Sequence, residues 1–505
     1  MFSRVPVVFS GVSRRLVDAA PAILALLVLS SAAPAQTILW TKNHGGAQSD
    51  GAYDVTETTD GGFIVAGFRS RANSLQDFHL LRTSSGGEMV WSRTFPGPLN
   101  GWASEVLELP DGGFIAAGVI EVNPQTFDSY VVRTDASGNP LWARQYDAGI
   151  GDDDRAHAIC LTEDGGFIIA GQAWWPEPPF GSYDVYVVKC DGLGNRAWSR
   201  LYKWAPEGAD VALSVAQTPD GGYLIGGFTQ AGTWDGYVLR TDPLGNVLWQ
   251  RTYGGDWGDE AYDLKLTADG GFVLTGAFIS NTQTDTDLGL VKANAAGDVE
   301  WERVYGGIDA EWGQQVWPTS DGGYLVSGHT ASYGAGSWDG YVLRTDPNGT
   351  QLWTQTFGGE SDDRGFAVEQ TMDGDAIVAG WAWSFGSGMG DVYLLKIDDG
   401  ATVDIAEDGA PGVGGSVDLR VAPTPFREST QLELSLPTSR RVVLRIFDVT
   451  GHEVRTLLAG ETGAGTRSIA WDGRDSTGRP VASGMYFGSL LVDGHTVTRK
   501  LIRLP

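Results

Sequence analysis

The residues with catalytic or metal-binding capacity lack the spacing of any familiar site. No histidine among the 505 residues has a partner at metal-ligand spacing. The six histidines are His44, His79, His157, His329, His452 and His495. The sequence contains neither a Gly-x-Ser-x-Gly nucleophile elbow nor a phosphate-binding loop. The sequence therefore favours a protein that is not an enzyme.

Carboxylates are the exception, because the chain has 63 Asp and Glu residues. Two carboxylates can act as acid and base on a glycosidic bond, but only at a separation in space that sequence spacing does not give. A polysaccharide-active hydrolase or lyase is therefore the alternative function. Acidic residues 151–154 and 284–287 offer oxygen ligands to calcium, yet without the spacing of a calcium loop. We expect no cofactor, and calcium is the one ion that these stretches could attract.

A short motif, Asp-Gly-Gly before an aromatic and apolar run, shows which elements position these groups. The motif recurs at intervals of 49 to 56 residues. Its copies begin at Asp60, Asp111, Asp164, Asp220, Asp269 and Asp321, with an altered seventh copy at Asp373. Asp-Gly favours a tight two-residue β-turn with positive φ angles, and the apolar run suits a strand covered on both faces. Four strands, a to d, fit each repeat, which is the signature of an all-β, seven-bladed β-propeller.

Two further positions recur in every repeat. Strand c begins at an Asp and ends at a base in seven pairs: Asp77–Arg82, Asp128–Arg133, Asp184–Lys189, Asp235–Arg240, Asp287–Lys292, Asp339–Arg344 and Asp391–Lys396. Strand d carries Trp91, Trp142, Trp198, Trp249, Trp301 or Trp353, and the seventh tryptophan, Trp40, precedes the first repeat. We therefore expect the N-terminal strand 38–42 to pair with strand 391–397 and to close the ring of four-stranded blades.

The combined pattern resembles a known family. Residues 38–398 follow W-x-R-T-[YF]-G-G, then D-G-G-[FY]-[ILV]-[ILV]-x-G, then D-x-Y-V-[LV]-[KR]-x-D-x-x-G. This pattern is similar to the seven-bladed β-propeller repeats of secreted bacterial proteins. That family has no common catalytic residues, so the resemblance implies a fold and no active site.

Composition divides the chain into four parts. Residues 1–35 have arginines before an apolar run and then Ala33-Pro34-Ala35, which is typical of a cleaved signal peptide. We predict a propeller over 36–398, a linker over 399–415 and a small β-sandwich over 416–505. The protein should be secreted or displayed at the cell surface. Its formal net charge of −28 argues against nucleic acid or an anionic membrane as partner. Cys160 and Cys190 should be buried thiols two strands apart, too far for a disulfide.

The last segment resembles two related groups of exported domains. The residues that carry the resemblance are Pro425-Phe426, Val443–Gly451, Trp471-Asp472-Gly473, Gly484 with Tyr486, and Lys500. One group is the immunoglobulin-like domain of flagellar hook-capping proteins, and the other is the C-terminal sorting domain of type IX secretion. Thr424 stands where the sorting domains have Asn. The resemblance implies a domain for sorting or anchoring, and its partner would be the secretion or anchoring machinery.

Strand direction places the b–c and d–a loops on one face of the propeller, opposite the tight turns. The predicted ligand-binding face consists of Trp102, Trp174, Trp175, Phe180, Trp204, Trp234, Trp257, Trp312, Trp338, Trp381 and Trp383. Flat aromatic faces beside carboxylates suit sugar rings. The alternative is that these rings fold back and fill gaps between blades. We expect a non-catalytic protein that binds a glycan or another extracellular ligand, or else a scaffold for protein interactions.

The same face carries an acidic residue at the entry to strand a of six repeats. These residues are Asp50, Asp154, Asp210, Asp259, Glu311 and Asp363, and Gly101 is the exception. A carboxylate that recurs once per blade is typical of capping, so we expect these side chains to accept hydrogen bonds from loop amides.

Overall fold

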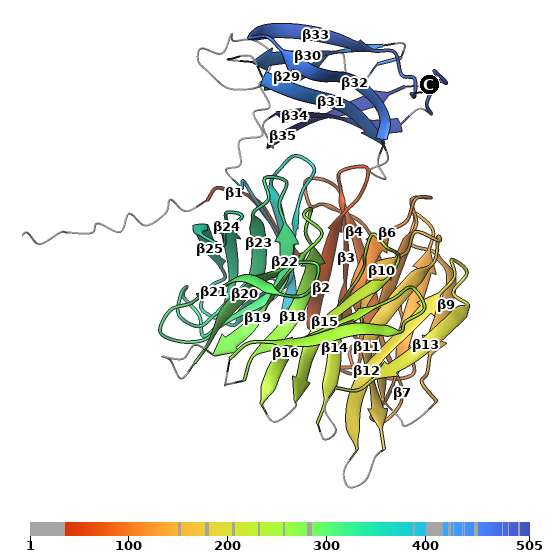
Figure 1. Cartoon of the computed structure of the whole chain (residues 1–505). Coiled ribbons are helices and arrows are strands. Elements are labelled where there is room, and N and C mark those ends of the chain that lie inside the picture. The colour runs from red at the N-terminus through yellow and green to blue at the C-terminus, as the bar shows by residue number, and fades with distance from the viewer. Residues whose placement is uncertain are drawn as a thin grey trace, which may run out of the picture.

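The computed structural model describes residues 36–149, 153–176, 181–204, 208–230, 233–255, 258–279, 285–386, 389–399 and most of 418–504. In the last stretch, residues 423–425, 428, 437, 439, 449–452, 477, 483 and 493–494 are not described. The predicted signal peptide lies outside the described residues. The chain is an all-β protein: a seven-bladed propeller followed by an immunoglobulin-like β-sandwich (Figure 1).

Each propeller blade is a four-stranded antiparallel sheet, and in six of the seven blades the strands follow chain order from the axis outward. Blades 1 and 2 comprise β2 (Asp50–Glu57), β3 (Phe63–Ser70), β4 (Gln76–Thr83), β5 (Met89–Phe95), β6 (Gly101–Glu108), β7 (Phe114–Asn123), β8 (Thr126–Thr134) and β9 (Pro140–Tyr146). Blades 3 and 4 comprise β10 (Asp154–Leu161), β11 (Phe167–Trp175), β12 (Ser182–Cys190), β13 (Arg196–Tyr202), β14 (Asp210–Gln217), β15 (Tyr223–Gln230), β16 (Trp234–Thr241) and β17 (Val247–Tyr253).

The remaining blades follow the same order. Blades 5 and 6 comprise β18 (Glu260–Leu266), β19 (Phe272–Ile279), β20 (Thr286–Ala293), β21 (Val299–Tyr305), β22 (Glu311–Pro318), β23 (Tyr324–Thr330), β24 (Asp339–Thr345) and β25 (Gln351–Phe357). Blade 7 comprises β26 (Asp363–Gln370), β27 (Ala376–Ala382), β28 (Asp391–Ile397) and the N-terminal strand β1 (Ile38–His44). The pairing of β1 with β28 places Trp40 opposite Lys396 and confirms the predicted closure of the ring.

Tryptophans of the outer strands join neighbouring blades. In six of the seven cases the ring packs against the aromatic residue that follows Asp-Gly-Gly in the next blade, as Trp91 does on Phe114 with ring centroids 5.7 Å apart. Blade 7 has Ala376 at this position, and Trp353 packs in the same core cluster. Trp40 and Phe63 repeat this contact across the closing seam at 5.9 Å. Burying such large rings removes apolar surface from water and accounts for the conserved spacing of the two positions along the repeat.

The Asp-Gly-Gly segment forms a longer turn than the sequence predicts. β2 ends at Glu57 and β3 begins at Phe63, so five residues connect them instead of two. Gly61 donates its N–H to the carbonyl of Thr58, and φ is positive at Gly61 alone, at 80°. The two-residue turn was wrong because the Asp60 carboxylate stabilises the longer turn from within. It accepts hydrogen bonds from Thr58 Oγ1 at 2.7 Å and from Gly62 N at 3.1 Å, and it also pairs with Arg82.

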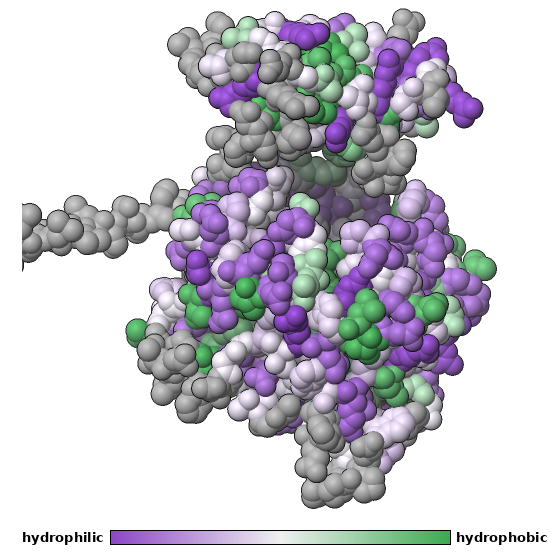
Figure 2. Space-filling model, viewed as in Figure 1, coloured by the Kyte–Doolittle hydropathy of each residue, from purple (hydrophilic) through white to green (hydrophobic). Residues whose placement is uncertain are grey.

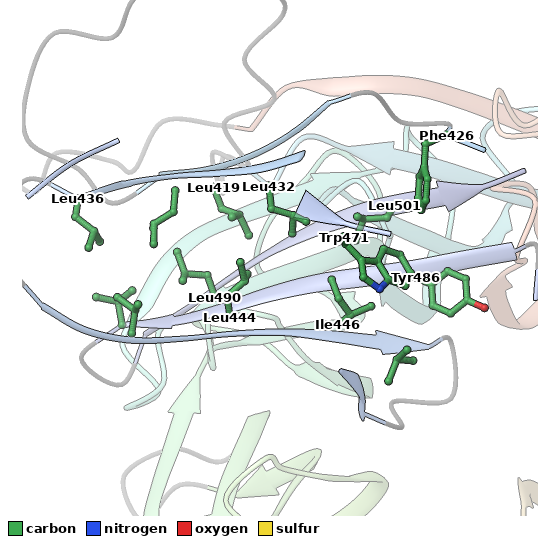
Figure 3. Packing of buried hydrophobic residues seen from close by; sticks show 14 residues of the cluster. Leu419, Phe426, Leu432, Leu436, Leu444, Ile446, Trp471, Tyr486, Leu490 and Leu501 are labelled. Carbon is green, nitrogen blue, oxygen red and sulfur yellow. The ribbon is translucent and has the colours of Figure 1, made fainter. Parts of the chain in front are cut away.

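The second unit packs two sheets around one core. Its strands are β29 (Asp418–Ala422), β30 (Thr430–Leu436), β31 (Arg440–Asp448), β32 (Glu453–Thr462), β33 (Gly465–Trp471), β34 (Gly484–Val492) and β35 (His495–Arg503). The sheets have the orders β29-β30-β33 and β32-β31-β34-β35. Trp471 lies in the core between Phe426 and Tyr486, with ring centroids at 5.5 and 5.1 Å (Figure 3). Three of the residues that carry the family resemblance therefore form one buried cluster.

The two cysteines are free, as predicted. Cys190 is fully buried on β12, whereas Cys160 on β10 is half-buried. Strand β11 lies between their strands and keeps the thiols apart.

The visible side of the propeller presents no broad apolar face. Hydrophobic side chains in this view lie singly or in small groups among hydrophilic ones (Figure 2). Outer-strand residues such as Val90 and Leu141 are among the exposed apolar residues.

Candidate functional site

The inner strands of all seven blades carry a bulge and line a cavity on the propeller axis. We count repeat positions from Asp50, Gly101, Asp154, Asp210, Asp259, Glu311 and Asp363. The pairing register shifts around the fourth position in every blade, as between Ala52 and Asp54 in β2. A bulge redirects a side chain out of the regular alternation. The fourth-position residues all line one cavity of about 360 Å³ and are half-buried: Tyr53, Ser104, His157, Leu213, Tyr262, Gln314 and Phe366. We call this space the axial cavity, and its volume suits a small ligand.

Acidic side chains from the fifth position of three inner strands also line the axial cavity. These are Asp54, Glu105 and Asp263, and the ammonium of Lys265 lies among them. Lys265 Nζ is 3.5 Å from Asp263 Oδ1 and 4.0 Å from Glu105 Oε1. The Lys265 side chain is 25% exposed, so solvent reaches this group.

The same carboxylates connect successive blades. Asp54 Oδ2 accepts a hydrogen bond from Val106 N at 2.9 Å, and Glu105 Oε2 accepts one from Ile159 N at 2.7 Å. Asp263 Oδ2 accepts one from Val316 N at 3.1 Å. Each bond therefore satisfies a backbone donor of the next blade, which would otherwise be costly to bury.

Burial and mutual charge set the protonation of this group. Burial raises the pKa of Glu105 to about 8, although Lys265 acts in the opposite direction. Burial likewise raises the pKa values of Asp54 and Asp263. For Lys265, burial opposes the charge, but Asp263 and Glu105 outweigh burial and raise the pKa of the ammonium. Lys265 is therefore a permanent cation beside Asp263 and Glu105, and Glu105 is the carboxyl of this group that keeps its proton near neutral pH.

Aromatic rings form a continuous arc beside the axial cavity, from blade 5 through blades 6 and 7 to blade 1. Successive ring centroids in the arc are 5.1 to 6.2 Å apart. Its members, in order, are Tyr262, Trp312, Trp338, His329, Phe366, Trp381 and Tyr53. Burial lowers the pKa of His329 to about 3, so this imidazole is neutral and packs as a ring. We call this set the aromatic arc.

The predicted binding tryptophans lie on the expected face, but most are not in loops. Six occupy the ends of strands: Trp102, Trp174, Trp175, Trp234, Trp312 and Trp381. The loop placement of these six was wrong, because the strands extend into this face and their terminal rings pack against neighbouring aromatic rings. Trp204, Trp338 and Trp383 lie in loops. Phe180 and Trp257 lie outside the described residues.

Exposure separates Trp383 from the other predicted tryptophans. It is 54% exposed, whereas the described others are half-buried. Three exposed side chains accompany it in nearby loops of blades 6 and 7: Tyr333, Phe385 and Met389. Single rings thus partly fill gaps between blades, as the alternative interpretation held, while a set of rings stays accessible on the predicted face.

The acidic residues that begin the inner strands cap loop amides, which confirms that prediction. Asp210 Oδ2, for example, accepts a hydrogen bond from Trp204 N at 2.6 Å, and Asp363 Oδ2 accepts one from Gly359 N at 2.7 Å. The other members accept comparable bonds. In blade 2, where Gly101 stands instead, Glu121 accepts a hydrogen bond from Asn100 Nδ2 at 2.6 Å. These carboxylates are structural, so they leave the axial cavity as the better site.

Nothing in the described part of the chain gathers three or more potential metal ligands. Of the two calcium candidates, residues 151–152 and 284 are not described. Asp153 pairs with Arg155 at 2.8 Å, and Asp154 Oδ2 accepts a hydrogen bond from Ala148 N at 2.8 Å. Over the same described residues, a search for helices of sufficient length and apolar character to cross a membrane finds none.

Sequence reasoning missed the axial residues. The fourth position varies from Ser104 to Phe366, so it gives no repeat signal. The acids at the fifth position were a usable signal, because Asp54, Glu105 and Asp263 stand at equivalent places before an apolar residue. An acid between apolar residues of a buried strand is rare without a partner.

Comparison with known proteins gives a family match in the C-terminal unit and similarity to two curated proteins. Residues 426–490 match the family described as FlgD Ig-like domain. The chain is similar to the regulatory protein FlaEY of Caulobacter vibrioides, with 26% identity over 197 residues, 34% of this chain and 20% of the relative. It is also similar to the outer membrane protein assembly factor BamB of Burkholderia pseudomallei, with 34% identity over 194 residues, 34% of this chain and 47% of the relative. The chain thus spans about a fifth of the length of FlaEY and about half of the length of BamB.

Among solved structures, the chain is similar to PorZ of Porphyromonas gingivalis, described as a bacterial surface component of the type-IX secretion system. The TM-score is 0.40 and the identity 13%, over 92% of this chain and 60% of that one. The fold and site thus define a class: a β-propeller with a polar and aromatic axial cavity. The particular member of that class adds a C-terminal domain that matches the FlgD Ig-like family.

Proposed function

We propose that the protein is a non-catalytic binding or display protein of the bacterial cell envelope or exterior. Its propeller binds a glycan or another extracellular ligand at the axial cavity and the aromatic face around it. Its C-terminal domain serves sorting or anchoring. The observation that carries this proposal is the aromatic arc, because its rings border a cavity that also offers carboxylates and amides. Sugars are bound by this combination of stacking and polar contacts.

Two further observations support the envelope location. The curated relative BamB is by name an outer membrane protein assembly factor, and the FlgD-like family at residues 426–490 is named after a flagellar protein. The charge of −28 is compatible with an exterior protein and unfavourable for nucleic-acid binding.

The proposal is tested by glycan-array binding of the full chain and two variants. Trp383→Ala removes an exposed ring of the proposed face, and we expect binding to fall at least fivefold. Leu244→Ala is the matched control, because Leu244 is 64% exposed and lies in a c–d turn on the opposite face. Equal binding by both variants, or no glycan bound by the unmodified chain, would contradict a glycan site on this face.

The hydrolase or lyase alternative has one specific observation in its favour. Glu105 and Asp263 both approach Lys265 in the axial cavity, and the pKa of Glu105 is raised to about 8. A carboxyl that keeps its proton at neutral pH can act as a general acid. Release of reducing sugar from a bound polysaccharide, lost in Glu105→Gln, would establish the enzyme and replace the non-catalytic proposal.

A further inference from the structure

The axial cavity combines features that select the charge of its ligand. Three carboxyl groups line it, from Asp54, Glu105 and Asp263. Among the described lining residues the positive charge comes from Lys265, since burial lowers the pKa of His157 to about 4 and leaves that ring neutral. The lining thus holds more acidic groups than basic ones, in a site where water is partly excluded and charges interact strongly.

Four aromatic side chains complete this environment. Tyr53, Trp102, Tyr262 and Phe366 line the cavity from blades 1, 2, 5 and 7. Aromatic faces attract cations, and the attraction grows when the cation is desolvated. An aromatic wall together with an acidic floor is suited to an organic cation and repels an anion.

Uncharged polar side chains complete the lining. Ser104 of β6 and Gln314 of β22 line the cavity at the fourth position and are half-buried. A hydroxyl and an amide both donate and accept hydrogen bonds, so these side chains suit the hydroxyls of a sugar.

We infer that the axial cavity binds a hydroxyl-bearing organic cation, an amino sugar with a free ammonium group. In this arrangement the aromatic side chains contact the apolar face of the sugar ring, the carboxylates of Asp54 and Asp263 attract the ammonium, and polar groups such as Gln314 meet the hydroxyls. The inference rests on the proposed function and names the ligand class for the same site. The volume of about 360 Å³ is in the range of pockets that hold molecules of this size.

The test compares two probes that differ in charge but share the sugar ring. Glucosamine oligosaccharides carry free ammonium groups, whereas N-acetylglucosamine oligosaccharides are neutral. Isothermal titration of the full chain should show at least tenfold tighter binding of the charged series. Asp54→Asn and Asp263→Asn keep an acceptor oxygen for the backbone of the next blade, so each should reduce binding of the charged series at least fivefold without unfolding the blades.

Glu88→Gln is the matched control. Glu88 also carries one negative charge, but its side chain is 73% exposed on the outer edge of blade 1, beside Lys42. The Glu88→Gln variant should bind both series of oligosaccharides like the unmodified chain. Far-ultraviolet circular dichroism should confirm that all variants are folded.

The outcomes separate the two proposals. Equal binding of the charged and neutral series would overturn the cation inference and leave a glycan site standing. Array binding of other glycans, without any binding of glucosamine oligosaccharides, would also overturn the cation inference and leave a glycan site standing. Loss of binding in Glu88→Gln equal to that in Asp263→Asn would show a general charge effect and overturn the inference. Preferential binding of the charged series that depends on Asp54 and Asp263 supports it.

Discussion

The two faces of the propeller are built from the same seven repeats but follow opposite rules. At the face with the tight turns, every blade repeats one ion pair between the Asp of Asp-Gly-Gly and the base that ends strand c. The seven pairs are Asp60–Arg82, Asp111–Arg133, Asp164–Lys189, Asp220–Arg240, Asp269–Lys292, Asp321–Arg344 and Asp373–Lys396. At the opposite face, the second and fourth residues of the inner strands change from blade to blade.

The difference teaches where to look for function in a repeat protein. Residues that recur in all blades hold the blades together, because each one meets the same neighbours in each repeat. Residues that vary among blades are free of that requirement. On this protein the variable positions converge on one axis, where seven different side chains meet in the axial cavity.

The largest expected effect is a loss of stability that differs between two of the seven ion pairs, because one of them has an additional buried partner. Arg344 also pairs with Asp399 at 2.9 Å, and the Asp399 side chain is fully buried, whereas Asp220, the partner of Arg240, is 64% exposed. Arg344→Met leaves the buried carboxylate of Asp399 without its cation and should lower the free energy of unfolding by about 3–5 kcal/mol. Arg240→Met, the matched control, should cost about 1 kcal/mol. Urea unfolding followed by tryptophan fluorescence measures both, and equal losses would mean that the seven pairs are equivalent.

The next largest effect is the difference in stability between the loss of a packed tryptophan and the loss of an exposed one on the face opposite the tight turns. Trp381 contacts Phe366, Phe68 and Tyr53 with ring centroids at 5.4, 5.6 and 6.2 Å. Trp381→Ala should therefore destabilise the protein by about 2–3 kcal/mol. Trp383→Ala, two residues away, should change stability by less than about 0.5 kcal/mol. Thermal unfolding of the two variants tests this, and a large loss in Trp383→Ala would assign that ring to packing and not to binding.

The smallest effect is a pH dependence that comes from two buried glutamates. Glu105 lines the axial cavity, and Glu369 of β26 accepts a hydrogen bond from Glu57 N at 3.0 Å. Burial raises the pKa values of Glu105 and Glu369 to about 8 from 4.5. Between these values the folded state keeps protons that the unfolded state releases, so stability falls as pH rises towards 8. From pH 6.5 to 8 each group should contribute about 1–2 kcal/mol to that fall.

Glu105→Gln removes one titrating group and should reduce the fall between pH 6.5 and 8 by about 1–2 kcal/mol. Glu88→Gln should leave it unchanged, because Glu88 lies far from the cavity in an exposed pair with Lys42. Denaturant unfolding at pH 6.5, 7.2 and 8 is the measurement. An identical slope in Glu105→Gln would show that Glu105 ionises normally in the folded protein.

Much of the architecture could be predicted because it depends on local, repeated chemistry. The spacing of Asp60 and its copies defined the blades, and the position of Trp40 predicted how the ring closes. The bulge at Tyr53 and its equivalents could not be predicted, since it depends on the register between β2 and β3. The exposure of Trp381 and Trp383 could not be predicted either, because it depends on which rings arrive from neighbouring blades.

The closing strand has a consequence for how the protein is made. Among the propeller strands β1 is made first, and its partner β28 is made last. The six other blades consist of consecutive strands and can assemble as they emerge, but blade 7 waits for both ends of the propeller segment. Pairing between distant segments is slow because a long loop must close first. Any factor that holds β1 apart from β28 would therefore keep the propeller open, and release of β1 would set the moment at which the ring is sealed.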